Sequence, residues 1–299
     1  IFEAKALKKK FYLIEYFIKN INFIEYIKFL SNRSKFNPIK IREFKKYIKN
    51  IKSKQTLNFS FKNKKNGYLL VESFINHPAY SLSNIVIGKY LQKIKGFEMI
   101  GVVRKFDYKS EVLFRAFGVK KLIFFTGANI FERIYYLLKA ASINFKFKNI
   151  NQSLNYKYEG IDVGMFAHDT YIRYLGIPTI KNIDSNYIIF FAETLYAINF
   201  FKKKIFQKKN ISGLIQSETQ FTPLNILFQI TLNNNLDVFS RIGIEKFTVR
   251  HYTKWSQRYS NRMSFSQKLF DYIYLNYKKK GLIYFNKLYL SKIKNKIFG

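Results

Sequence analysis

Apolar residues recur along the chain at two different spacings, and the spacing changes near position 67. Residues 5–52 place lysines among Phe, Ile, Leu and Tyr at intervals of three and four, which is typical of amphipathic helices. From Tyr68 onward, short apolar runs alternate with helical segments, which predicts βαβ units and a parallel sheet. We therefore expect a basic helical extension over residues 1–66, an α/β domain over residues 67–250, and a basic helical segment over residues 251–299.

The central segment supplies the elements of the sheet. The expected strands are Tyr68–Val71, Met99–Val103, Lys121–Phe125, Ile211–Gln216, Val238–Arg241 and Phe247–Val249. The expected helices are Tyr80–Lys93, a short helix capped by Ser110 and ending at Gly118, Ile130–Ala141, Met165–Leu175, Asn186–Phe201 and Pro223–Asn233. Asn186–Phe201 is very apolar, but it is shorter than the roughly 20 residues of a membrane span and contains Glu193, so it predicts a buried helix. The expected fold class is α/β, a Rossmann-like parallel sheet with flanking helices.

Composition sets the broad class of protein. A chain of 299 residues, 48% of them hydrophobic, can bury a sizeable core. It has no cysteine, which excludes disulfides, thiolate metal sites and a cysteine nucleophile and fits a reducing compartment. Because no secretory signal pattern opens the sequence, we expect a cytoplasmic location.

The net charge of +35 points toward polyanionic partners, nucleic acid or an anionic membrane. The codon bias of an A/T-rich genome, which favours Lys, Asn, Ile, Phe and Tyr, is the competing explanation. Residues 1–66 hold 18 Lys and Arg against 4 Asp and Glu, residues 67–200 hold 16 against 10, and residues 201–299 hold 19 against 4. This uneven distribution favours a balanced globular centre with basic flanks that rest on anionic lipid at the inner membrane face or on a polyanionic substrate.

Several common motifs are absent from the sequence. It contains no P-loop, dinucleotide-binding glycine pattern, zinc-binding His-Glu-x-x-His or RNA-recognition aromatic signature. Asp-x-Asp, which holds a divalent ion against a sugar-nucleotide diphosphate in many enzymes, is also missing. We therefore predict no metal site and no tightly bound cofactor.

The first candidate site is the loop from Glu72 to Tyr80, between the first expected strand and its helix. Ligands of open α/β sheets bind at the carboxyl ends of strands, so Glu72 and Asn76 are candidates for substrate binding. His77 could remove a proton from a sugar hydroxyl, because the pKa of imidazole lies near neutrality. The alternative is that His77 only caps the following helix.

The second candidate site lies on the helix that follows Gly160-Ile161-Asp162-Val163-Gly164. Positions 169 and 173 share a helix face, so Asp169 and Arg173 can pair or hold a polar ligand together, with His168 beside them. Asp169 is a candidate base, and Arg173 is a candidate for holding acidic or phosphorylated groups. The alternative is an ordinary surface ion pair.

A third polar cluster, Gln216-Ser217-Glu218-Thr219-Gln220, follows an expected strand directly. Glu218 could orient an acceptor there. Ser217 or Thr219 could instead serve as simple helix N-caps.

Two of these blocks resemble bacterial glycosyltransferases of capsule and surface-polysaccharide biosynthesis. The first block is Gly67–Arg104, with Glu72-Ser73-Phe74-Ile75-Asn76-His77-Pro78 and Gly88-Lys89-Tyr90-Leu91-Gln92-Lys93. The second block is Gly160–Gly176, with its Asp-x-Tyr-x-Arg. The resemblance implies a GT-B plan, in which an amino-terminal Rossmann-like domain meets the acceptor and a second domain binds the nucleotide-sugar. It also implies site roles for Asp169 and Tyr171, while Met165 and Phe166 depart from the family pattern. We expect this chain to end near the passage between the two domains.

The expected function is therefore transfer of a sugar from a nucleotide-sugar to a surface or capsular polysaccharide, with a glycan or lipid-linked acceptor. Peripheral contact with an anionic membrane would explain the basic flanks. The main alternative is a basic nucleic-acid-binding protein of ribosomal type, in which Lys grips phosphates and Tyr stacks on bases. A second alternative is a non-catalytic scaffold with the same fold.

Overall fold

The computed structural model describes residues 67–75, 78–180, 182–217, 219–242 and 248–258, besides residues 46, 49 and 50 and scattered positions between 271 and 287. The chain divides into two compact units, Ile1–Thr253 and Lys254–Gly299. All elements below belong to the first unit. The helical extensions expected over residues 1–66 and 251–299 lie largely outside the described residues.

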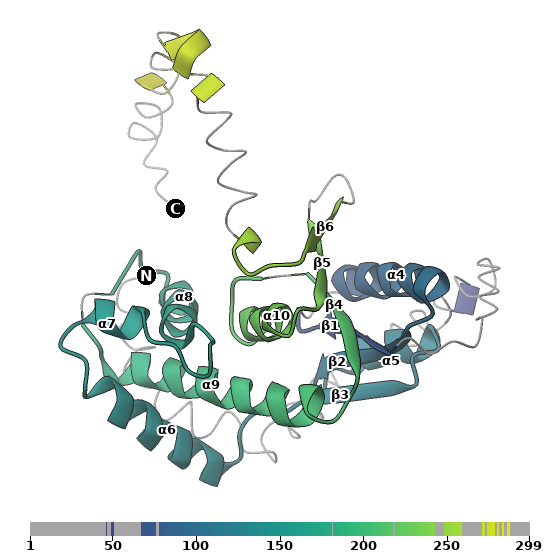
Figure 1. Cartoon of the computed structure of the whole chain (residues 1–299), viewed down its shortest axis with the longest axis horizontal. Helices are drawn as coiled ribbons and strands as arrows, with labels where there is room; N and C mark the ends of the chain where they lie inside the picture. The colour runs from purple at the N-terminus through teal and green to yellow at the C-terminus, as the bar shows by residue number, and fades with distance from the viewer. Residues whose placement is uncertain are drawn as a thin grey trace. The chain divides into compact units, whose positions relative to one another are not determined.

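A six-stranded sheet forms the centre of the first unit (Figure 1). Its strands are β1 (Tyr68–Ser73), β2 (Glu98–Arg104), β3 (Lys121–Phe125), β4 (Ile211–Gln216), β5 (Asp237–Ile242) and β6 (Thr248–Tyr252). The spatial order is β3-β2-β1-β4-β5-β6, and every pairing is parallel except β5 with β6. This order reverses between β1 and β4 and is compatible with a Rossmann-like fold.

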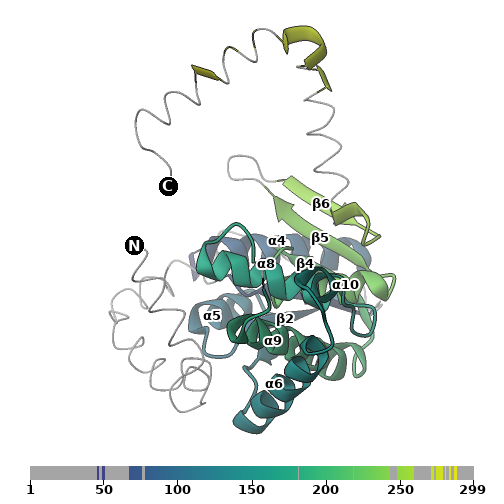
Figure 2. The same ribbon diagram turned by 90° about the vertical axis from the view of Figure 1, so that its left-hand side faces the viewer.

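Helices cover both faces of the sheet. They are α4 (Pro78–Lys95), α5 (Tyr108–Ala116), α6 (Ile130–Asn144), α7 (Ile150–Leu154), α8 (Val163–Leu175), α9 (Ser185–Phe201) and α10 (Leu224–Asn233), with a π-helical turn, η1 (Lys202–Phe206). In Figures 1 and 2, α4 and α5 lie on one face of the sheet, while α9 and α10 lie on the other. Among the described residues, no helix is long and apolar enough to cross a membrane.

The core between the sheet and α4 explains why the strands are almost continuously apolar. Leu69 and Val71 of β1 pack into one buried cluster with Ile85 of α4 and Phe114 of α5. Strands buried on both faces need apolar residues at successive positions, which is the pattern of a parallel sheet. Space is tight here, because a Cβ on Gly101 of β2 would lie 2.6 Å from Leu122 and 2.9 Å from Phe114.

The structure confirms the α/β class and a mostly parallel sheet, with Lys121–Phe125 and Ile211–Gln216 matched at both ends. Strand β1 runs to Ser73, so Glu72 lies at the end of the strand and not in the following loop as expected. The expected strand Phe247–Val249 overlaps the start of β6, which is antiparallel to β5. The expected cap of α5 is wrong: Asp107 is the N-cap, and its side chain accepts a hydrogen bond from the backbone N–H of Ser110. The short helix α7 was not expected, because its five residues carry no apolar periodicity. Asn186–Phe201 is a buried helix, as expected.

Candidate functional site

The carboxyl ends of β1 and β4 lie side by side where the strand order reverses. In an open α/β sheet, ligands bind in the crevice outside the strand ends at such a reversal. The chain leaves β4 through residues 217–223, which we call the β4–α10 loop, and Glu218 within it lies outside the described residues. This loop is the structural centre of the candidate site.

Glu72 ties the first end of the β4–α10 loop to β1. Its side chain is only 1% exposed. One carboxylate oxygen accepts the backbone N–H of Phe74, and the other accepts the backbone N–H of Ser217 at 3.1 Å. A buried carboxylate is stable when backbone donors satisfy it, so Glu72 fixes the two strand ends relative to each other.

Asn84 of α4 braces the same junction from the helix side. Its Nδ2 donates to the backbone oxygen of Glu72 and to Oγ of Ser217, both at 2.9 Å. The amide is fully buried, and its Oδ1 has no hydrogen-bond partner among the described residues. A buried acceptor without a partner is costly, and contact with a ligand is one way in which it can be satisfied.

A buried group of hydroxyls joins β1 to the first turns of α4 and α5. Oγ of Ser73 donates to Oγ of Ser110 at 2.6 Å and also hydrogen-bonds Oγ of Ser81. Ser110 in turn donates to the carboxylate of Asp107 at 2.7 Å. This network fixes the two helix N-termini at the carboxyl edge of the sheet. The sequence gives no signal for it, because it depends on three separate elements meeting.

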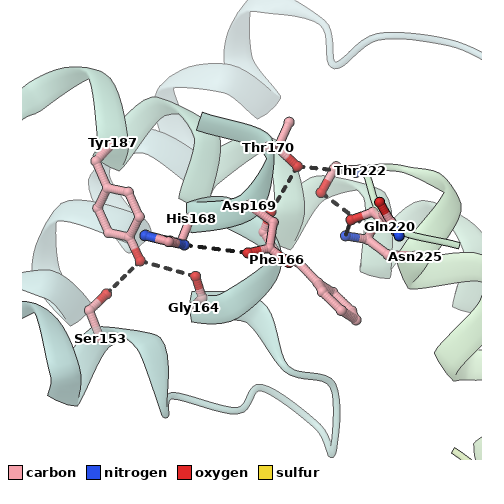
Figure 3. A network of polar contacts seen from close by, with 10 residues as sticks. All are labelled: Ser153, Gly164, Phe166, His168, Asp169, Thr170, Tyr187, Gln220, Thr222 and Asn225. Carbon is pink, nitrogen blue, oxygen red and sulfur yellow. Dashed lines mark hydrogen bonds and ion pairs between the residues drawn. The ribbon is translucent and has the colours of Figure 1, made fainter. Parts of the chain in front are cut away.

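The second end of the β4–α10 loop contacts α8 (Figure 3). The backbone N–H of Thr222 donates to Oγ1 of Thr170 at 3.1 Å, and Thr170 itself donates to the backbone oxygen of Phe166. The guanidinium of Arg173 lies 3.8 Å from the centre of the Phe221 ring. A single loop therefore links the end of β1 to the polar face of α8.

Asp169 and His168 lie together on α8 next to this contact (Figure 3). The His168 Nδ1 is 3.4 Å from the Asp169 carboxylate, and both side chains are partly exposed. Asp169 does not form an ion pair with Arg173 in the described part of the chain, since the Arg173 side chain stacks on Phe221 instead. The expected pairing of Asp169 with Arg173 is therefore not formed. Asp169 lies beside His168, and Arg173 stacks separately on Phe221.

Tyr171 has a different position from its neighbours. It is almost fully buried, and its hydroxyl donates to Asp184 at 2.7 Å. Burial, with the hydrogen bond to Asp184 adding to it, raises the pKa of Tyr171 above its ordinary value. Because Asp184 is also the N-cap of α9, this tyrosine joins α8 to α9.

A further cation lies at the same edge of the sheet. Arg241 is the last but one residue of β5, and its guanidinium lies 4.8 Å from the ring centre of Tyr80 in the first turn of α4. Its Nε is buried without a hydrogen-bond partner among the described residues. Sequence reasoning missed Arg241, because only the folded sheet brings the end of β5 close to α4.

Tyr171 is buried between α8 and α9, and the other predicted site residues fall into three groups. Glu72 meets Ser217 at one end of the β4–α10 loop, and Arg173 meets Phe221 at the other. His168 and Asp169 adjoin the second contact. Asn76, His77 and Glu218 lie outside the described residues.

The site offers acid–base and hydrogen-bonding groups: a carboxylate, an imidazole, an amide oxygen and two arginines. Among the described residues, no group of three or more His, Cys, Asp or Glu side chains could hold a metal ion.

Comparisons of this chain with protein-family profiles, with curated proteins and with solved structures give no match.

Proposed function

We propose that this chain is a glycosyltransferase of the GT-B type that moves a sugar from a nucleotide-sugar to a surface or capsular polysaccharide acceptor. The observation that carries the proposal is the β4–α10 loop, which links the end of β1 through Ser217 to α8 through Thr222. The first and second sequence blocks that resemble these enzymes thus adjoin one loop at the reversal of strand order. Strand ends at such a reversal are where nucleotide and sugar ligands bind in α/β folds.

The chemistry of the edge suits a sugar acceptor. Asp169 is partly exposed and lies beside His168, so its carboxylate can take the proton from an acceptor hydroxyl. The oxygen of the acceptor hydroxyl then bonds to the anomeric carbon of the donor sugar. The bond between that carbon and the nucleotide diphosphate breaks, and its electron pair leaves with the diphosphate. Arg173, exposed at the end of α8, can hold acidic or phosphorylated groups of the acceptor. Asn76 and His77 lie between β1 and α4 in the sequence, and Glu218 belongs to the β4–α10 loop. All three remain candidates for ligand contact or proton transfer.

A binding titration tests this proposal against its main alternative. The protein is titrated with a panel of nucleotide-sugars and, separately, with single-stranded and double-stranded RNA at several salt concentrations. We expect saturable binding of at least one nucleotide-sugar or glycan and only weak RNA binding. Silence toward every sugar ligand, together with submicromolar RNA binding that falls steeply with salt, would establish the nucleic-acid alternative.

Asp169→Asn is expected to lower kcat of sugar transfer by about 100-fold or more, because a positioned general base contributes that much to such reactions. The KM for the nucleotide-sugar should change little, and so should the melting temperature, since Asp169 is partly exposed. The matched control is Glu111→Gln on α5, an exposed acid whose ion pair with Arg115 is a surface contact. Equal losses of kcat in both variants would show that Asp169 is not the general base.

A further inference from the structure

Helix α6 carries several large apolar side chains on the outside. Phe131 is 80% exposed, Leu138 is 65% exposed and Phe145, at the C-cap, is 85% exposed. Ile134 and Tyr135 are exposed as well. At 3.6 residues per turn, these five positions fall within an arc of about 100° on one side of the helix. We call these five residues the α6 outer face.

The buried side of α6 is more polar than its outer face. The buried positions are Arg133, Tyr136, Ala140 and Asn144. Arg133 Nε donates to the backbone oxygen of Ala128 at 2.7 Å, and Asn144 accepts a hydrogen bond from Ser153 Oγ at 2.9 Å. These two hydrogen bonds fix the rotation of α6 about its own axis, and in this orientation the apolar residues of the outer face point away from the core. The usual amphipathic arrangement is inverted.

Basic residues accompany the outer face. Lys146 and Lys148 are exposed directly after α6, and Lys139 lies on its flank, with its amine 2.9 Å from the hydroxyl of Tyr158. Between residues 126 and 148 the sole acidic residue is Glu132. Its carboxylate accepts the backbone N–H of Asn129 in a capping box at the start of the helix. The surface is therefore apolar at its centre and positive at its carboxyl end.

The positive charge beside the α6 outer face decides which partner could cover it. A second copy of the chain also carries a net charge of +35, so it would bring like charge to these lysines. Residues 1–66, with 18 Lys and Arg against 4 Asp and Glu, carry the same sign. A bilayer with anionic headgroups offers both an apolar interior for aromatic side chains and negative charge for the lysines.

We propose that the α6 outer face is the surface by which this protein binds an anionic lipid bilayer. Phe131, Leu138 and Phe145 insert among the acyl chains, and Lys146 and Lys148 contact the headgroups. The inference deepens the proposed function, since it supplies the surface that would bring the chain to a lipid-linked acceptor. The inference rests on α6 and the residues directly after it, and on no sugar chemistry.

Vesicle co-sedimentation of the whole protein tests the proposal. The probes are vesicles of phosphatidylcholine mixed with phosphatidylglycerol and vesicles of phosphatidylcholine alone. The test variant combines Phe131→Ser, Leu138→Gln and Phe145→Ser, and the control combines Tyr90→Gln and Ile94→Gln on the exposed side of α4. Because α4 and α6 lie on opposite faces of the sheet, one flat bilayer cannot contact both (Figure 1).

We expect the wild-type and control proteins to bind the anionic vesicles, and the test variant to bind at least about tenfold more weakly. In the wild-type protein, amide exchange in α6 should slow when anionic vesicles are added, which is a readout that does not depend on the variant folding. Wild-type binding that the test variant retains would overturn the proposal, and so would a loss of binding in the α4 control. If the wild-type protein is a dimer and the test variant is a monomer, the α6 outer face binds a second copy of the chain and not a bilayer. Vesicle binding with no sugar-ligand binding would leave this inference standing while the proposed function fails.

Discussion

Replacing Gly164 by alanine is expected to destabilise the protein by about 3 kcal/mol or more, the upper range for overpacking a core. A Cβ at this position would lie 1.6 Å from the backbone oxygen of Ser153 and 2.6 Å from its carbonyl carbon. Neither atom belongs to a flexible side chain, so α7 and α8 would have to move apart. The hydroxyl of Tyr187 bridges the same contact, since it bonds Ser153 Oγ at 2.9 Å and donates to the backbone oxygen of Gly164 at 3.2 Å.

Urea denaturation followed by circular dichroism measures this effect. Gly88→Ala on α4 is the control, because an added Cβ there meets side-chain atoms and no backbone: the flexible end of Met99 at 2.7 Å and Cγ2 of Val71 at 3.1 Å. Alanine is also the better helix former. We expect a large fall in the unfolding midpoint for Gly164→Ala and a small change for Gly88→Ala. An unchanged midpoint in Gly164→Ala would mean that α7 and α8 do not approach as closely as described.

Glu72→Gln is expected to lower the free energy of unfolding by about 2–4 kcal/mol and to abolish ligand binding at the sheet edge. The carboxylate accepts two backbone N–H groups, from Phe74 and Ser217, and an amide can replace only one of its two acceptor oxygens. The amide nitrogen would face a backbone donor at a buried position. The end of β1 and the start of the β4–α10 loop would then lose their connection.

The control for this variant is Glu98→Gln, at the opposite edge of the same sheet. Glu98 forms a partly exposed ion pair with Lys121 at 3.1 Å, and such pairs contribute about 1 kcal/mol or less. Chemical denaturation of the two variants gives the comparison directly. Similar stabilities for Glu72→Gln and the wild-type protein would show that the buried carboxylate is not what holds the loop.

The sheet could be predicted from the sequence because its signals are local. Strands buried on both faces are continuous apolar runs, so Lys121–Phe125 and Ile211–Gln216 are recognised without any knowledge of their neighbours. Helix ends were less predictable. The cap of α5 depends on which side chain reaches a free N–H, and Asp107 competes successfully with Ser110 because it sits one position before the helix.

The candidate site could be predicted only in part. Placing Glu72 and Ser217 at strand ends follows from the strand pattern, but their hydrogen bond requires β1 and β4 to be neighbours. The stacking of Arg173 on Phe221 and of Arg241 on Tyr80 joins residues that are distant in sequence. The inverted orientation of α6 could not be foreseen either, because periodicity alone predicts that the apolar side of a helix faces inward.

The central claim is that the β4–α10 loop and α8 form the ligand site of a glycosyltransferase. Hydrogen exchange with mass spectrometry tests it most directly, with the protein alone and with saturating nucleotide-sugar, glycan acceptor or both. We predict slower exchange in residues 217–223 and 163–175, with α5 unchanged as an internal reference. Exchange in those two segments that stays the same with every sugar ligand, or protection confined to other parts of the chain, would contradict the claim.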